Sequence, residues 1–130
     1  REAESPWSNR VHIDDLVRAC LAAGERGRPG AVYNISDGHP TTMTDYFNRV
    51  ADALGLERPP QITLAQARAE LSEGMQSYLA ESKRLDNQRM RTELGVEPRY
   101  PDLAQGLAAC LGDAAGGNQR HAGDRQGKAK

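Results

Sequence analysis

Residues 9–16, with the sequence NRVHIDDL, mark the start of the first expected helix and decide how the chain around them is interpreted. Asp14 and Asp15 place negative charge where a helix N-terminus favours it. The residues that follow have apolar side chains at helical spacing, namely Leu16, Ala19, Cys20 and Ala23. Gly24 and Gly27 end this pattern. The sequence therefore predicts a helix with an acidic N-terminus in this part of the chain.

A short apolar segment follows this helix. Residues 31–35 (AVYNI) are β-prone and lie between Gly30 and the pair Asp37-Gly38, so they predict a buried strand. A lone strand cannot satisfy its own backbone donors and acceptors. We therefore expect the neighbouring strands to come from sequence outside this chain or from a second copy of it.

Four more helices are expected along the rest of the chain, each near a residue that can cap its N-terminus. They run from a cap within residues 41–44 to Gly55, over about residues 64–71, over residues 87–94, and from Asp102 to about Leu111. Residues 72–84 have no clear period, and residues 77–79 can be extended. The chain thus predicts a mostly helical α/β fold with one or two short strands and about five helices. Residues 1–111 form one domain, and residues 112–130 are expected to be a disordered tail.

The composition argues against some classes of partner. The net charge is −1, with 17 basic and 18 acidic residues, which gives no reason to expect nucleic acid or an anionic membrane. No apolar run approaches the length of a membrane span. Cys20 and Cys110 lie on apolar stripes, which indicates free buried thiols rather than a disulfide. These features favour a cytoplasmic protein.

Several kinds of catalytic motif are absent from the sequence. No two glycines stand two positions apart, so there is no G-x-G-x-x-G loop, and no Gly-Lys pair is followed by Ser or Thr, so there is no P-loop. No Tyr is followed by Lys four positions later. His12, Asp14, Asp15 and His39 are more easily explained by structural roles than as metal ligands. We expect no catalytic, cofactor-binding or metal-binding residues in this chain.

Three segments, in order, resemble motifs of the extended short-chain dehydrogenases. Residues 9–16 resemble the R-x-x-H-V-D-D-L motif, and in particular the N-R-I-H-x-D-D-L form of the atypical sugar-nucleotide-epimerase-related group. Residues 30–38 (GAVYNISDG) resemble the G-x-x-Y-N-I-x-x-G strand of the family. Residues 81–84 (ESKR), followed by Leu94-Gly95 and Pro98, resemble the S-K-R…E-L-G-W-x-P ending. The resemblance spans residues 7–111.

The resemblance implies a function for the chain. In this family the N-terminal half binds NAD(P) and carries a Tyr/Lys pair, whereas the C-terminal half covers the cleft and binds the nucleotide-sugar. The match covers only the second half, so it implies the substrate-binding portion of an NAD(P)-dependent epimerase/dehydratase, not catalytic alone. NAD(P) is then expected only with the full-length family architecture. The alternatives are a stand-alone binding or dimerisation module that keeps the fold, and a small helical regulator.

Four residues are candidates for binding the substrate. The resemblance implies that Arg10 reaches a substrate diphosphate, and a guanidinium suits two phosphate oxygens at once. A salt bridge from Arg10 to Asp14 or Asp15, or exposure to solvent, is an equal alternative. Asn9 can donate to the same ligand, although a turn-forming role is favoured. Lys83 and Arg84 form a second candidate anion site before a helix N-terminus, with a solvated pair near a cap as the alternative.

The remaining motif residues are expected to have structural roles. His12 is expected to be packed and hydrogen-bonded. Asp14 is expected to cap the first helix, and Asp15 to accept from backbone donors or from Arg10. Tyr33 and Asn34 are expected in the core and at the strand edge.

Overall fold

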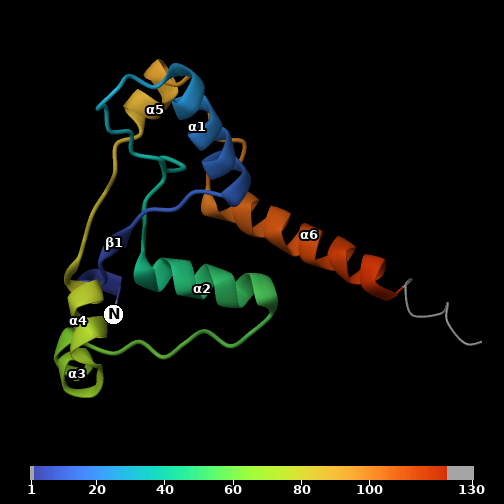
Figure 1. The fold of residues 1–130 in the computed structure, drawn as a ribbon. Coiled ribbons are helices and arrows are strands. Elements are labelled where there is room, and N and C mark those ends of the chain that lie inside the picture. The colour runs from blue at the N-terminus through green and yellow to red at the C-terminus, as the bar shows by residue number, and fades with distance from the viewer. Residues whose placement is uncertain (1, 123–130) are drawn as a thin grey trace, which may run out of the picture.

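The structure, a computed structural model, describes residues 2–122. It is a mostly helical α/β fold with six α-helices and one two-stranded sheet among these residues. The elements are a 3₁₀ turn at Glu2–Glu4, β1 (Trp7–Ser8), α1 (Ile13–Arg26), β2 (Thr41–Thr42), α2 (Met43–Leu54), α3 (Leu64–Glu70), α4 (Glu73–Ala80), α5 (Gln88–Glu93) and α6 (Leu103–Ala122). Figure 1 shows α1 and α5 together at one end and α3 and α4 at the other.

Helix α1 forms where the first motif predicts it, but with a different N-cap. His12 is the N-cap, and its Nδ1 accepts from the backbone N–H of Asp14 at 3.2 Å. The expectation that Asp14 caps the helix is therefore wrong, because Asp14 already lies in the first turn. The helix ends at Gly27, where a Cβ would lie 2.3 Å from the carbonyl oxygen of Ala23. This close approach explains why the chain has a glycine there.

The core lies between α1 and α5 and is small. Its fully buried members come from these two helices and the turn after α5: Ala19, Ala22, Met90, Leu94 and Val96. Tyr33 and Ile35 pack against them. Arg26, in the last turn of α1, donates twice to the carbonyl of Leu94 at 2.6 and 2.9 Å. These contacts hold α1 against α5.

The two strands of the sheet are each two residues long. They are antiparallel, with Trp7 opposite Thr42 and Ser8 opposite Thr41. Thr42 then caps α2, accepting from the backbone N–H of Asp45 at 3.1 Å, as the sequence predicts for residues 41–44. The sheet therefore fixes the start of α2 beside the residues that precede α1.

Residues 31–35 are not a strand in this structure, which corrects the prediction. They belong to no helix or strand, although their side chains alternate between half-buried and exposed positions as those of a strand do. No neighbouring strand pairs with them among the described residues, because the sheet that this chain forms consists of β1 and β2. The sequence pattern thus matches the alternation of burial, but no strand forms there in the described part of the chain.

Three further expectations need correction. Residues 73–80 form α4, which the sequence left without a clear pattern. Helix α6 continues to Ala122, beyond the end expected near Gly112; the rest of the expected tail lies outside the described residues. Cys20 and Cys110 are free, as expected, but both are exposed. In residues 2–122, no helix is long and apolar enough to cross a membrane.

Candidate functional site

The candidate site is built around β1 and the two residues after it. Asn9 fixes the segment before α5 beside this strand: its Nδ2 donates to the carbonyl of Lys83 at 3.0 Å, and its Oδ1 accepts from the N–H of Leu85 at 2.7 Å. Trp7 adds two backbone contacts, since its N–H donates to Ser82 Oγ at 3.0 Å and its carbonyl accepts from the N–H of Lys83 at 3.2 Å. Segments more than seventy residues apart thus meet at β1.

Arg10 lies half-buried against the start of α2. Its Nη1 donates to Thr41 Oγ1 at 3.0 Å, and its guanidinium carbon lies 3.7 Å from the centre of the Tyr46 ring. Its Nη2 contacts the sulfur of Met43 at 3.9 Å. A guanidinium stacked on an aromatic face is held in one orientation by cation–π attraction. The structure thus positions Arg10 firmly without using all of its donors.

The charge of Arg10 is not neutralised by a close carboxylate. Among the residues that the structure describes, Arg10 makes no ion pair, so the alternative of a salt bridge to Asp14 or Asp15 is not observed. Burial lowers the pKa of the Arg10 guanidinium, and the Tyr46 and Asp37 side chains oppose this shift. An arginine nevertheless stays charged at neutral pH. A partly buried cation of this kind favours an anionic ligand.

Lys83 and Arg84 are exposed residues of the segment that runs beside β1. Lys83 Nζ pairs with Glu81 at 2.8 Å, and this contact lowers the pKa of the Glu81 carboxyl. Arg84 lies over the Trp7 ring, 5.3 Å from its centre. Lys83 therefore already has an acidic neighbour, whereas the contact of Arg84 leaves its guanidinium facing solvent.

A cavity of about 130 Å³ lies beside Asn9 and Lys83. Its other lining residues are Pro6, Trp7, Ser8, Met43, Tyr78 and Glu81. Pro6 and Met43 also line a more apolar cavity of about 210 Å³, between α2 and α3. The structure thus brings Asn9 and Lys83 to one cavity, whereas Arg10 contacts Met43, which lines both cavities, and is not itself a lining residue of either.

The N-terminus of α5, which the sequence predicts to assist Lys83 and Arg84, already binds one carboxylate. Helix α5 starts at Gln88, and the N–H of Gln88 donates to Asp86 Oδ1 at 2.8 Å. The Asn87 side chain points elsewhere and donates to the carbonyl of Ser36 at 2.8 Å. This carboxylate satisfies one of the free N–H groups at the helix start. The contribution of this helix end to an anion site stays a prediction.

The motif residues at the start of α1 bind other parts of the chain. Asp15 is 2% exposed and accepts from the backbone N–H groups of Arg99 and Tyr100, each at 3.0 Å, and from Arg18 at 2.8 Å. Burial raises the pKa of the Asp15 carboxyl, but these hydrogen bonds outweigh burial and lower it overall. The His12 ring is 4.0 Å from the Tyr100 ring. The first motif thus fixes the turn before α6.

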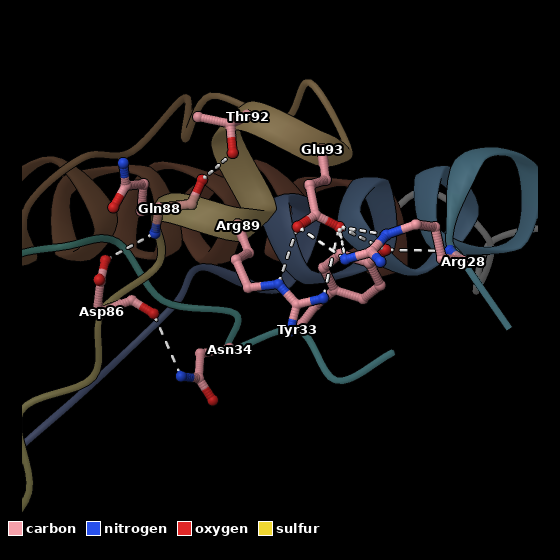
Figure 2. A network of polar contacts seen from close by, with 8 residues as sticks. All are labelled: Arg28, Tyr33, Asn34, Asp86, Gln88, Arg89, Thr92 and Glu93. Carbon is pink, nitrogen blue, oxygen red and sulfur yellow. Dashed lines mark hydrogen bonds and ion pairs between the residues drawn. The ribbon is translucent and has the colours of Figure 1, made fainter. Parts of the chain in front are cut away.

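Tyr33 and Asn34 belong to a polar network on the outer side of α5 (Figure 2). The Tyr33 hydroxyl accepts from the N–H of Arg28 at 3.0 Å and donates to Glu93 at 3.1 Å. Asn34 donates to the carbonyl of Asp86 at 3.2 Å. Glu93 also pairs with Arg28 and Arg89, and hydrogen bonds, first from Arg89, lower the pKa of its carboxyl to about 2. This network holds residues 33–34 against α5.

Sequence reasoning did not identify the residues that surround Arg10. Tyr46, Met43 and Thr41 come from β2 and α2, more than thirty positions further along the chain. Tyr46 is a residue of α2 that belongs to no sequence motif. Its contact with Arg10 is therefore recognised only once β1 is seen to pair with β2. No group of three or more His, Cys, Asp or Glu residues in the described part of the chain has an arrangement that could hold a metal ion.

Several known proteins resemble this chain in fold or in sequence. A solved structure of a conserved protein of unknown function from Silicibacter pomeroyi DSS matches with a TM-score of 0.75 and 34% identity, covering 83% of this chain and 38% of that one. A 3-diazoavenalumate denitrifying reductase from Streptomyces sp. is 31% identical over 97 residues, covering 75% of this chain and 32% of the relative. The chain is similar to proteins of the epimerase/dehydratase type.

Two further relatives support this similarity. A dTDP-glucose 4,6-dehydratase from Streptomyces griseus is 31% identical over 107 residues, which are 78% of this chain and 28% of the relative. Protein YeeZ from Escherichia coli K12 is 34% identical over 95 residues, which are 72% and 30% of the two proteins. The chain therefore spans about a third of the length of the curated relatives it matches. No family model matches it.

Proposed function

We propose that this chain is the substrate-side portion of an NAD(P)-dependent epimerase/dehydratase-like oxidoreductase, and that Arg10 binds the diphosphate of a nucleotide-sugar. The observation that carries the proposal is the guanidinium of Arg10, which Thr41 and Tyr46 orient while no carboxylate pairs with it among the described residues. An oriented guanidinium with donors to spare can contact two phosphate oxygens at once. The similarity to a dTDP-glucose 4,6-dehydratase supports this class of ligand.

Asn9 and Lys83 have different parts in this proposal. Both polar atoms of the Asn9 amide are bonded to backbone groups of Lys83 and Leu85, so Asn9 positions the cavity wall instead of donating to a ligand. Lys83 and Arg84 lie at the exposed rim, where they attract an anion but contribute little binding energy each. Arg10 is therefore the residue on which the affinity depends most.

The cofactor does not fit the residues of this chain. NAD(P), when bound in a complete protein of this type, supplies hydride transfer, but its phosphates need a glycine-rich turn at a helix N-terminus. No two glycines of this chain stand two positions apart. We therefore assign no cofactor contact and no catalytic step to the described residues. The function proposed for the chain is binding of the substrate.

Thermal unfolding with dTDP- and UDP-sugars tests the proposal. A ligand present at 100 times its dissociation constant stabilises the folded state by about 2.7 kcal/mol. Arg10→Ala should weaken binding by about tenfold or more, because a charged hydrogen bond contributes about 1.5–3 kcal/mol. Arg10→Lys keeps the charge without the planar fork and should restore part of the affinity. Arg49→Ala, which removes an exposed arginine paired with Asp45, is the matched control and should bind normally.

Two results would contradict the proposal. One is a folded sample whose unfolding temperature no sugar nucleotide changes. The other is binding that Arg10→Ala and Arg49→Ala affect equally, since a general loss of positive charge would then explain the effect.

A further inference from the structure

Two aromatic side chains line the cavity beside Asn9 and Lys83. Trp7 comes from β1 and Tyr78 from α4, and 41% and 59% of their surfaces are exposed. Arg84 lies over the Trp7 ring at 5.3 Å and still leaves this much of Trp7 open. Exposed aromatic rings at a cavity can bury a large area against a planar ligand. The cavity therefore offers two rings to one ligand.

The volume of this cavity matches a single six-membered ring. It is about 130 Å³, and a cavity of about 150 Å³ accepts one benzene molecule. A pyrimidine has one ring of this size, whereas a purine fuses a second ring to it. A purine would have to leave part of its surface outside the cavity, so the volume favours a pyrimidine.

Two polar side chains of the cavity wall suit the edge of such a ring. Lys83 and Glu81 both line the cavity and bind each other at 2.8 Å. The ammonium group of Lys83 keeps further N–H donors, and the Glu81 carboxylate keeps further lone pairs. The imide edge of uracil or thymine carries an N–H between two carbonyl oxygens. An adjacent donor and acceptor can therefore bind it.

The cavity lies next to the residue proposed to bind phosphate. Met43 lines the cavity and contacts Arg10 Nη2 through its sulfur at 3.9 Å. Burial lowers the pKa of Arg10, and Tyr78 is among the side chains whose electrostatic effect opposes this shift. Tyr78 therefore lies near the Arg10 guanidinium as well as at the cavity. A nucleotide with its base in the cavity has its phosphates on the side of Arg10.

We propose that Trp7 and Tyr78 bind the pyrimidine base of a nucleoside diphosphate, and that the cavity they line selects pyrimidine over purine nucleotides. The inference rests on the proposed function, because Arg10 binds the diphosphate of the same ligand. Aromatic stacking accepts any base, so the selection comes from the volume of the cavity.

The apolar cavity between α2 and α3 is the competing location for a base. Its volume is about 210 Å³. Among the described residues, however, Phe47 is the one aromatic side chain that lines it, and no basic side chain does. The smaller cavity has two aromatic rings and Lys83, so it is the better match for a base that carries a diphosphate.

Tryptophan fluorescence tests the proposal, because Trp7 is the only tryptophan of the chain. UDP and dTDP should quench it on binding. ADP and GDP should bind about tenfold more weakly or worse, since a base that stays outside loses its stacking. Uridine, which has no phosphate, should also quench, at higher concentration. Inorganic pyrophosphate, followed by calorimetry, should bind through Arg10 and leave the fluorescence unchanged.

Two variants at Tyr78 separate the aromatic ring from the rest of the site. Tyr78→Ala should weaken UDP binding by roughly tenfold and leave pyrophosphate binding unchanged. Tyr78→Phe keeps the ring and should bind UDP as the wild type does. Leu64→Ala, at a 40% exposed residue that lines the larger cavity, is the control and should bind normally. Circular dichroism shows whether each variant remains folded.

The outcomes distinguish the base site from the role of Arg10. Equal affinity for UDP and ADP, or UDP binding that Tyr78→Ala leaves unchanged, would overturn the base site and leave the role of Arg10 in place. So would a loss of UDP binding in Leu64→Ala but not in Tyr78→Ala, because the base would then lie in the larger cavity. Quenching by UDP that depends on Tyr78 but not on Arg10 would support the base site and refute the diphosphate contact.

Discussion

Replacing the buried Asp15 by alanine should be among the most destabilising single changes of a polar residue in α1. The carboxylate joins α1 to the turn before α6 through two backbone N–H groups at 3.0 Å and Arg18 at 2.8 Å. Hydrogen bonds to a charged group contribute about 1.5–3 kcal/mol each. Arg18 keeps its hydrogen bond to the carbonyl of Glu97 at 3.1 Å after the substitution, and removing a buried carboxylate regains part of its desolvation cost. The two backbone bonds then leave a net loss of about 3 kcal/mol.

Urea unfolding followed by far-UV circular dichroism measures this loss, because the fold is mostly helical. A loss of about 3 kcal/mol lowers the folded-to-unfolded ratio by about two powers of ten and the unfolding temperature by roughly 10 °C. Asp14→Ala is the matched control, since Asp14 is the adjacent carboxylate and 53% of its side chain is exposed. Removing an acidic residue from a helix N-terminus costs about 0.3–1 kcal/mol.

Asp15→Asn tests the role of charge. Asparagine keeps one acceptor oxygen but turns an N–H₂ towards a backbone donor, so we expect a loss between those of the other two variants. If Asp15→Ala and Asp14→Ala unfolded at the same urea concentration, the bridge from α1 to Arg99 and Tyr100 would not stabilise the fold, and the reasoning would be refuted.

Two further predictions concern the network around α5. The pKa of Glu93 lies at about 2 against an ordinary value of 4.5, so its contribution to stability is complete above pH 4.5 and is lost as the pH falls towards 2. Glu93→Gln should therefore be less stable than wild type at pH 7, and urea midpoints measured at several pH values should converge in acid; parallel curves would contradict this. Gly38→Ala should lower the free energy of unfolding by about 1–2 kcal/mol in the same assay, because φ is +86° and the new Cβ would lie 3.0 Å from Asn87 Nδ2. Gly74→Ala is the control: Gly74 lies on open surface within α4, so the substitution should be neutral or stabilising.

Local features of the fold were predictable from sequence because their causes are local. The caps at Thr42 and Thr63 and the left-handed glycine at Gly55, with φ of +67°, lie where capping and glycine rules place them. Helix α4 was not predicted, because its apolar residues lack a clear helical period. The pairing of Trp7 with Thr42 was not predictable either, since two-residue strands carry no periodic pattern.

The candidate site was predictable in part for the same reason. Asn9, Arg10 and Lys83 could be selected by residue type and motif, and the structure places Asn9 and Lys83 at one cavity. The stacking of Arg10 on Tyr46 depends on where β2 sets the start of α2, which no local rule determines. That Arg10 makes no ion pair among the described residues is also a tertiary property, because Asp15 binds backbone donors near α6 and Asp37 acts on Arg10 without a salt-bridge contact.

Three side chains hold distant segments together by hydrogen bonds to backbone groups. Asn9 binds backbone groups of Lys83 and Leu85, Asp15 binds those of Arg99 and Tyr100, and Asn87 binds that of Ser36. In each case an amide or carboxylate side chain satisfies a backbone group that has no strand partner. With so few fully buried apolar residues, these bridges determine the relative positions of β1, α1 and α5. The arrangement around Arg10 therefore depends on them.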